Sequence, residues 1–127
     1  MTDKPPADMG AFQSRVLAWM TRCFQRSDAF TSEQRSFRFV EEALELAQAT
    51  GTTKEDVLRL VDYVYERPMG APQQEIGGVS VTLAALATAL GSQLSDCALA
   101  EIERCEQNTE KIRAKDLAKP NRTGALP

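Results

Sequence analysis

The chain of 127 residues contains no histidine. Without an imidazole, Ser–His and Cys–His nucleophile pairs are excluded, and so are most zinc sites. The three cysteines, Cys23, Cys97 and Cys105, are odd in number and form no C-x-x-C pair, which predicts free buried thiols in a reducing cytoplasm. Any catalysis must therefore depend on carboxylates, on lysine and arginine, or on a bound metal.

Aromatic residues make up only 6% of the chain, and its net charge is −3 with a pI near 5.0. A nucleic-acid-binding surface usually needs a basic stripe, and single-strand binding needs aromatic side chains for stacking, so neither is expected. The longest apolar run, from Val79 to Leu90, is too short to span a bilayer. Because the first residues also lack the segments of a secretory signal, we expect a cytoplasmic protein without membrane or nucleic-acid-polymer partners.

Helical periodicity and capping residues predict one all-α domain over residues 1–127, a bundle of four to five helices. The helices are expected over 10–25, 32–50, 53–66, 72–90 and 95–118. The pairs Thr31 with Gln34 and Thr52 with Glu55 fit capping boxes, and Gly51 and Gly91 fit the position that follows a helix C-terminus. Residues 1–9 and 119–127 are expected to form loose tails.

Three glutamates, Glu41, Glu42 and Glu45, crowd one arc of the second helix. At about 100° per residue they cover roughly 100° of its surface. Like charges at this spacing destabilise a helix by about 0.2–0.5 kcal/mol per pair. A hard divalent cation would offset the repulsion, since Mg²⁺ is held by one or two carboxylates plus waters and phosphates. The alternative is a solvated acidic face in which Arg38 pairs with Glu41 and Glu42.

The helix over 72–90 is apolar on nearly every side, which predicts that it is buried on every side. Glu75 is its only carboxylate and stands in its first turn. One interpretation is a favourable interaction with the positive end of the helix dipole. The other is a fourth carboxylate that enters the bundle opposite the other three. Gly77 and Gly78 fit no phosphate-binding loop, so we expect close packing or a locally distorted turn there.

The last helix is acidic in its first half and basic at its end, where it carries Lys111, Arg113, Lys115 and Lys119. Cations at a helix C-terminus are favourable on dipole grounds alone. In the functional interpretation, some of them neutralise phosphate oxygens.

These residues resemble the MazG-like all-α nucleoside triphosphate pyrophosphohydrolases, whose signature is E-E-x-x-E on one helix and E-x-x-D on a later one. Glu41 to Glu45 match the first part in full. The second part matches only at Glu75, because Gly78 stands where the family has aspartate. The sequence is also similar to a phage and prophage branch described as dATP/dGTP diphosphohydrolases, over residues 38–49, 60–65, 75–87 and 111–115. In that branch a glycine is usual at the position of Gly78. The resemblance covers roughly residues 12–127.

The resemblance implies an oligomeric helical bundle, a dimer or a tetramer, with active sites between helices. It implies hydrolysis of a (deoxy)nucleoside triphosphate, with dGTP or dATP favoured, to the monophosphate and pyrophosphate. The cofactor would be Mg²⁺ or Mn²⁺, and the setting phage nucleotide metabolism in the bacterial host cytoplasm. The implied metal ligands are Glu41, Glu42, Glu45 and Glu75, of which the first three are also the candidate catalytic residues. The candidate nucleotide- and phosphate-binding residues are Arg38, Asn108, Lys111, Arg113 and Lys115.

Three alternatives are open at this point. Asp62 is a candidate replacement for the missing aspartate, against an exposed position on the short helix. Trp19 and Phe37 lie on apolar stripes, so core packing is favoured over stacking on a base. The whole chain could instead be a non-catalytic helical adapter or regulator that retains the fold. A di-iron carboxylate protein is disfavoured, because such bundles normally need Glu-x-x-His.

Overall fold

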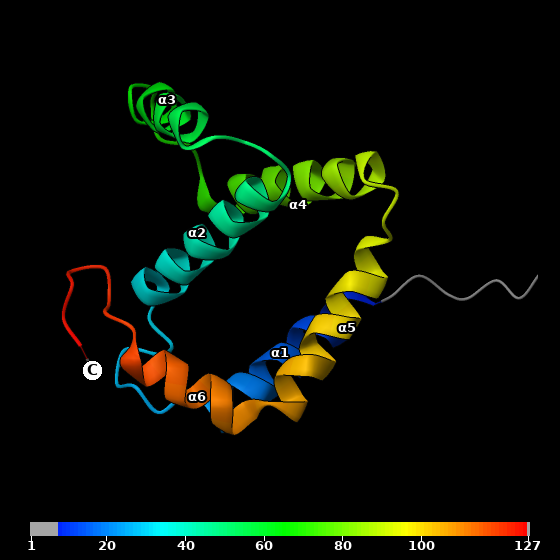
Figure 1. Cartoon of the computed structure of the whole chain (residues 1–127), viewed down its shortest axis with the longest axis vertical. Helices are drawn as coiled ribbons and strands as arrows, with labels where there is room; N and C mark the ends of the chain where they lie inside the picture. The colour runs from blue at the N-terminus through cyan, green and yellow to red at the C-terminus, as the bar shows by residue number, and fades with distance from the viewer. Residues whose placement is uncertain (1–7, 127) are drawn as a thin grey trace, which may run out of the picture.

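The computed structural model describes residues 8–126, and over that range the chain contains helices and no strand, which confirms the predicted all-α class. Six helices follow in order: α1 (Met9–Cys23), α2 (Ser32–Ala49), α3 (Lys54–Tyr65), α4 (Pro72–Ala89), α5 (Leu94–Gln107) and α6 (Thr109–Ala118). They wind around an open centre, with α1 behind α5 and α6 and with α3 outside the ring (Figure 1). Within residues 8–126, no single helix has both the length and the apolar composition needed to cross a membrane.

The small core lies where α1 packs against α5 and α6. Trp19, Cys23 and Ile102 are buried there, and Phe12 and Val16 pack against them. The apolar stripe on which Trp19 was predicted to lie is therefore the buried face of α1. Core packing of Trp19, favoured over base stacking, is confirmed as well, since its side chain is only 7% exposed.

The C-terminal helix is broken, which corrects the prediction of one helix over 95–118 and raises the number of helices above the expected four to five. The break lies at Asn108, whose backbone leaves the helical region (φ −123, ψ 28). The Cys105 carbonyl there accepts from the indole Nε1 of Trp19 at 3.1 Å and from the Thr109 hydroxyl at 3.2 Å. Helices kink where a side chain inserts into the backbone hydrogen-bond ladder, and Trp19 does so here from α1.

The predicted helix ends are correct in most places. Thr31 accepts from the backbone N–H of Gln34, and Gly51 and Gly91 adopt positive φ angles of 91° and 68° after their helices. The second capping box is displaced by one residue from the prediction: it joins Thr53 and Asp56. Asp56 takes the role predicted for Glu55 because α3 starts at Lys54.

Helix α4 is uncovered in the single chain, which contradicts the expectation of burial on every side. Ile76 is 66% exposed and Val81 is 70% exposed. A Cβ added at Gly77 or at Gly78 would meet nothing within 4 Å, so neither glycine permits a close contact within the chain. The bend between α4 and α5 is 102°, which carries α4 away from the core. An apolar pattern predicts that a surface should be covered, but not what covers it.

The three cysteines are free thiols, as predicted, but they are not all buried. Cys23 is buried and its thiol donates to the Thr109 carbonyl at 3.6 Å. Cys105 is half-buried, and Cys97 is exposed at the start of α5. Burial raises the pKa of the Cys23 and Cys105 thiols above the ordinary value.

A buried arginine connects the loop after α1 with the end of α6. The Arg26 side chain is 1% exposed, and its guanidinium donates to the Asp116 carbonyl at 2.9 Å and to the Lys119 carbonyl at 2.6 Å. It also pairs with Asp28 at 2.8 Å. This junction places the residues that follow α6 beside the first turns of α2.

We predict that Trp19→Phe lowers the free energy of unfolding by about 1–3 kcal/mol, because the variant loses a part-buried hydrogen bond and some core volume. Urea unfolding followed by circular dichroism at one protein concentration measures the loss. Leu17→Ala is the matched control on the same helix, since Leu17 is 56% exposed, and it should cost less than about 1 kcal/mol. Equal losses in the two variants would contradict the assigned role of Trp19.

Candidate functional site

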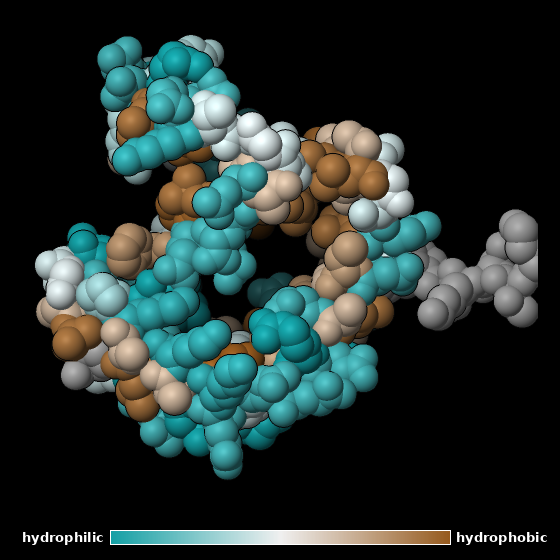
Figure 2. Space-filling view, in the orientation of Figure 1, coloured by the Kyte–Doolittle hydropathy of each residue, from teal (hydrophilic) through white to brown (hydrophobic). Residues whose placement is uncertain are grey.

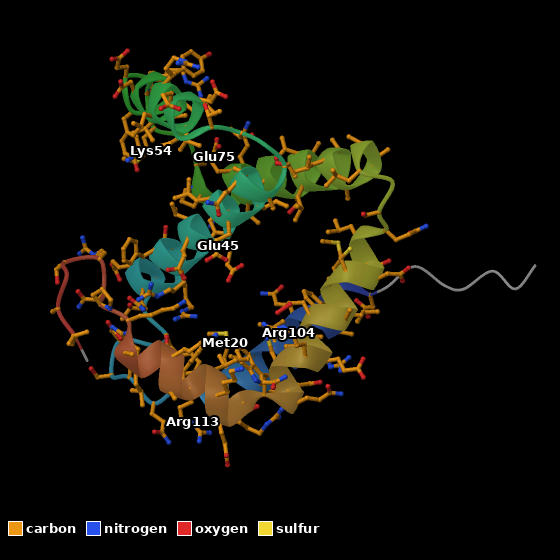
Figure 3. The ribbon with its side chains drawn as sticks, in the orientation of Figure 1. Met20, Glu45, Lys54, Glu75, Arg104 and Arg113 are labelled. Carbon is orange, nitrogen blue, oxygen red and sulfur yellow. The ribbon has the colours of Figure 1, made fainter. Side chains whose placement is uncertain are left out.

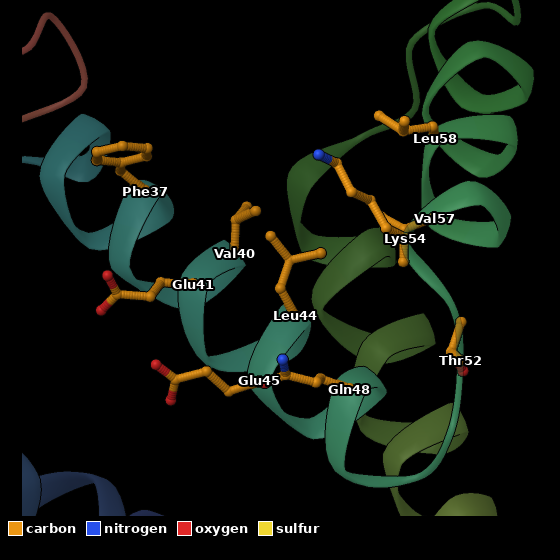
Figure 4. Close-up of a pocket in the computed structure, with 10 residues that line it drawn as sticks. All are labelled: Phe37, Val40, Glu41, Leu44, Glu45, Gln48, Thr52, Lys54, Val57 and Leu58. Carbon is orange, nitrogen blue, oxygen red and sulfur yellow. The ribbon is translucent and has the colours of Figure 1, made fainter.

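Helix α2 carries two faces of opposite character. Phe37, Val40 and Leu44 line a groove of about 630 Å³ between α2 and α3. Glu41 and Glu45 also line this groove, and their carboxylates extend from α2 in a different direction from these apolar side chains (Figure 4). The acidic face of α2, formed by Glu41, Glu42 and Glu45, therefore lies beside the apolar side chains, at the edge of the groove.

Glu41 is held by two cations. The ammonium Nζ of Lys119 lies 2.7 Å from Glu41 Oε1, and Arg38 Nη1 lies 3.3 Å from Oε2. Arg38 also donates to the Pro120 carbonyl. Lys119 and Pro120 therefore contact α2, whereas the sequence placed them in a loose tail. The hydrogen bond from Lys119 is the main cause that lowers the pKa of Glu41 below the ordinary glutamate range.

Glu42 has the opposite electrostatic environment. Glu42 is an exposed residue, yet desolvation by the surrounding atoms is the main cause that raises its pKa, and the charge of Glu45 raises it further. Glu41 and Glu101 act in the same direction, while Lys119 opposes them. The neighbouring glutamates therefore add to the effect of desolvation at Glu42.

The acidic face borders a hollow that helix α5 closes on the other side. The space-filling view shows this central hollow, with a hydrophilic wall along α2 (Figure 2). Glu45 and Arg104 point into it from opposite sides (Figure 3). Arg104 pairs with Glu101 on the same helix, its Nε donating at 2.8 Å, and these two side chains bring a further carboxylate and a cation to the rim.

Glu75 stands apart from the other three glutamates in the single chain. It lies in the first turn of α4, and its carboxylate packs over Gly70, where an added Cβ would come within 2.5 Å of Oε1. Over residues 8–126, no three Cys, Asp or Glu side chains converge closely enough to form a complete metal site. The structure thus groups Glu41, Glu42 and Glu45 on one face and leaves Glu75 outside that group.

The donor chemistry of the acidic face fits a hard divalent cation. Mg²⁺ needs only one or two protein carboxylates, since waters and phosphates complete its coordination. The Lys119 ammonium already stands as a cation at Glu41. At Glu42 the charges of Glu45 and Glu41 add to the effect of desolvation on the pKa, and a bound cation would act against these charges.

The predicted phosphate-binding residues have different environments. Lys111 and Lys115 are exposed on α6. Arg113 donates to the Cys23 carbonyl at 2.9 Å and to the Arg22 carbonyl at 2.7 Å, so its side chain caps the C-terminus of α1. Asn108 occupies the helix break, where its side-chain amide donates to the Arg104 carbonyl at 2.8 Å.

Two other residues named in the sequence analysis lie outside the acidic face. Asp62 is exposed on α3, in agreement with the alternative given for it. Phe37 is 38% exposed on the groove side of α2, so it is not packed in a core in the single chain. The Arg38 guanidinium lies 5.3 Å from the centre of its ring.

Sequence reasoning named Lys119 among the cations at the end of the last helix but left it out of the candidate phosphate-binding residues. It follows Lys111 and Lys115 at a spacing of four, so it extends the same basic stripe. That spacing was the available signal. The last helix was predicted to end at residue 118, and residues 119–127 were assigned to a loose tail. Glu101 and Arg104 were missed because nothing local indicates that α5 faces α2.

No protein-family model matches this chain, and neither a curated protein nor a solved structure matches it.

We predict that Glu41 and Glu42 titrate on opposite sides of the ordinary glutamate pKa, which is about 4.3 in unfolded chains. Carboxyl ¹³C NMR over a pH series measures both. Glu41, with its lowered pKa, contributes stability above the unfolded value, and that contribution is lost as the pH falls through the folded pKa. For Glu42, with its raised pKa, the contribution is present at low pH and is lost as the pH rises through the folded pKa.

Removal of the main partner provides the control for this titration. Lys119→Met should raise the pKa of Glu41 strongly, because its principal hydrogen bond is lost. The pKa of Glu42 should rise less, since Lys119 is not its largest influence. Coincident titrations of the two glutamates in the native chain would contradict the assigned environments.

Proposed function

We propose that the chain is a metal-dependent nucleoside triphosphate pyrophosphohydrolase of the MazG-like all-α type. It would convert a (deoxy)nucleoside triphosphate, with dGTP or dATP favoured, to the monophosphate and pyrophosphate. The observation that carries the proposal is the acidic face of α2, where Glu41 and Glu45 project together (Figure 4) and Glu45 points into the central hollow (Figure 3). Helical spacing places Glu42 on the same face. The purine preference and the setting in phage nucleotide metabolism rest on the sequence resemblance alone.

The residues of the acidic face suit the proposed reaction. A bound Mg²⁺ or Mn²⁺ supplies a water of lowered pKa and stabilises charge on the phosphates. Glu42 is the best candidate to accept a proton from the attacking water, since a base is most effective when its pKa approaches the working pH. The water oxygen bonds to the α-phosphorus, and the bond to the bridging oxygen breaks, so pyrophosphate leaves.

Arg38 serves the proposed site as a positioning residue. Its guanidinium holds Glu41 from one side and the Pro120 carbonyl from the other. Lys111 and Lys115, exposed on α6, are free of any ion pair among the described residues and stay candidates for contact with the phosphates.

The proposal includes a homo-oligomer, a dimer or a tetramer, and the exposed area supports it. A compact monomer of 14.0 kDa exposes about 6,700 Å², whereas this chain exposes 10014 Å². The difference is on the order of 3,000 Å² per chain, which is large enough for the surface that one subunit buries in an obligate interface. Many uncovered side chains of α3 and α4 are apolar, as in interfaces of that class, among them Leu60, Val64, Ile76 and Val81. A second copy that covers α4 would also change the surroundings of Glu75.

Product analysis tests the reaction directly. The purified protein is incubated separately with dGTP, dATP, dCTP and dTTP, with Mg²⁺, with Mn²⁺ and with EDTA, and the products are separated by ion exchange. We expect metal-dependent formation of monophosphate and pyrophosphate, fastest with a purine nucleotide. Diphosphate plus phosphate would reject attack at the α-phosphorus.

Glu42→Gln should reduce turnover by at least about 10³-fold, since it removes a metal ligand and the proton acceptor. Glu33→Gln is the matched control, because Glu33 is exposed in the first turn of the same helix and outside the acidic face. Near-native activity of Glu42→Gln would refute the site. Absence of turnover with every nucleotide and both metals would favour the alternative of a non-catalytic helical adapter.

For assembly, we predict a mass that is a multiple of 14.0 kDa in multi-angle light scattering coupled to size exclusion. Val81→Glu should dissociate the assembly, because it would bury a carboxylate in an apolar interface. Gln13→Glu on the exposed face of α1 makes a similar polar change away from α4 and should leave the mass unchanged. A monomeric native chain would contradict this part of the proposal.

A further inference from the structure

Hydrogen bonds hold the backbone of Lys119 in place, whereas its side-chain ammonium can change its partner. The Lys119 carbonyl accepts from buried Arg26 at 2.6 Å, and its N–H donates to the Asp116 carbonyl at 3.1 Å. The segment that follows forms a turn, in which the carboxamide oxygen of Asn121 accepts from the backbone N–H groups of Thr123 and Ala125. Whatever the ammonium does, the base of this side chain stays beside α2.

The ammonium itself is partly exposed, and so is its partner. The Lys119 side chain is 40% exposed and the Glu41 side chain 34% exposed. Ion pairs of this kind contribute little to stability, because water competes for both groups. The pair is therefore easily exchanged for a stronger interaction of the same carboxylate, such as ligation of a divalent cation.

We propose that Lys119 and a divalent cation compete for the Glu41 carboxylate, and that the displaced ammonium then binds a phosphate of the nucleotide. The inference rests on the proposed function and assigns a residue to substrate binding that lies outside the sequence motif. The metal-free protein would keep Glu41 neutralised by Lys119. Metal binding would free a cation at the place where a polyphosphate arrives.

The charges of the acidic face support this exchange. Glu41, Glu42 and Glu45 carry three negative charges, and Lys119 and Arg38 bring two positive ones. The face is therefore net negative without a metal and would repel a triphosphate. One bound divalent cation reverses the sign, and the freed ammonium adds a mobile donor for a phosphate oxygen.

The test measures Mn²⁺ binding by isothermal titration calorimetry, without nucleotide and without turnover. Lys119→Met should bind Mn²⁺ about two- to fivefold more tightly than the native chain, as expected when a partly exposed ion pair no longer competes. With Mn²⁺ saturating, the same variant should bind inorganic triphosphate several-fold more weakly. The opposite signs of the two effects separate exchange from a general loss of structure.

Arg122→Met is the matched control. It removes one positive charge from the same C-terminal segment, and Arg122 is exposed without an ion pair among the described residues. Neither affinity should change in it. The fold should survive Lys119→Met, because Arg26 binds the backbone carbonyl of residue 119. Lys119→Arg, which keeps the charge, should restore triphosphate binding.

The outcomes separate this inference from the proposed function. If Mn²⁺ binds the native chain and Lys119→Met equally, and Glu41→Gln weakens that binding, the metal site stands and competition by Lys119 is refuted. Weaker Mn²⁺ binding in Lys119→Met would refute it as well. If Mn²⁺ binds neither protein, the proposed function fails and the competition fails with it.

Discussion

The contacts of Arg26 are the constraint on which the arrangement of the candidate site depends. Helix α2 makes few contacts with other helices, so its position is set mainly at its N-terminal end. Arg26 lies in the loop after α1, and its guanidinium donates to two carbonyl groups at the end of α6, with its charge balanced by Asp28. An arginine suits this role because its planar group offers several donors in fixed directions. Its burial is tolerable because each direction meets an acceptor.

From that junction the electrostatics of α2 follow. The segment after α6 is brought alongside the helix, and two of its residues reach Arg38 and Glu41. Lys119 and Arg38 thereby lower the pKa of Glu41, while the pKa of its neighbour Glu42 is raised. Two adjacent glutamates with pKa values moved in opposite directions are a common arrangement at sites where carboxylates divide their roles.

The parts of the structure that depend on local interactions were predictable from the sequence. Thr31, Gly51 and Pro72 act within a few residues of themselves, so the helix ends they set were found. The break at Asn108 was missed because its cause, the Trp19 indole, is 86 residues away from the carbonyl it binds. The pairing of Lys119 with Glu41 spans 78 residues and was missed for the same reason. The acidic arc was predictable because helical spacing alone places Glu41, Glu42 and Glu45 on one face, whereas the separation of Glu75 depends on the path of α4.

The uneven burial of the three cysteines gives the chain a graded susceptibility to electrophiles and oxidants. Cys97 is exposed at the start of α5, beside the bend that leads to α4. Cys23 is enclosed by the core, and its raised pKa keeps the thiolate scarce. Oxidative damage would therefore begin at the α4–α5 corner and reach the α1 core last, after the packing around Trp19 has opened. The thiol nearest the uncovered helices is the one that a covering subunit would shelter, and the thiol in the core needs no such protection.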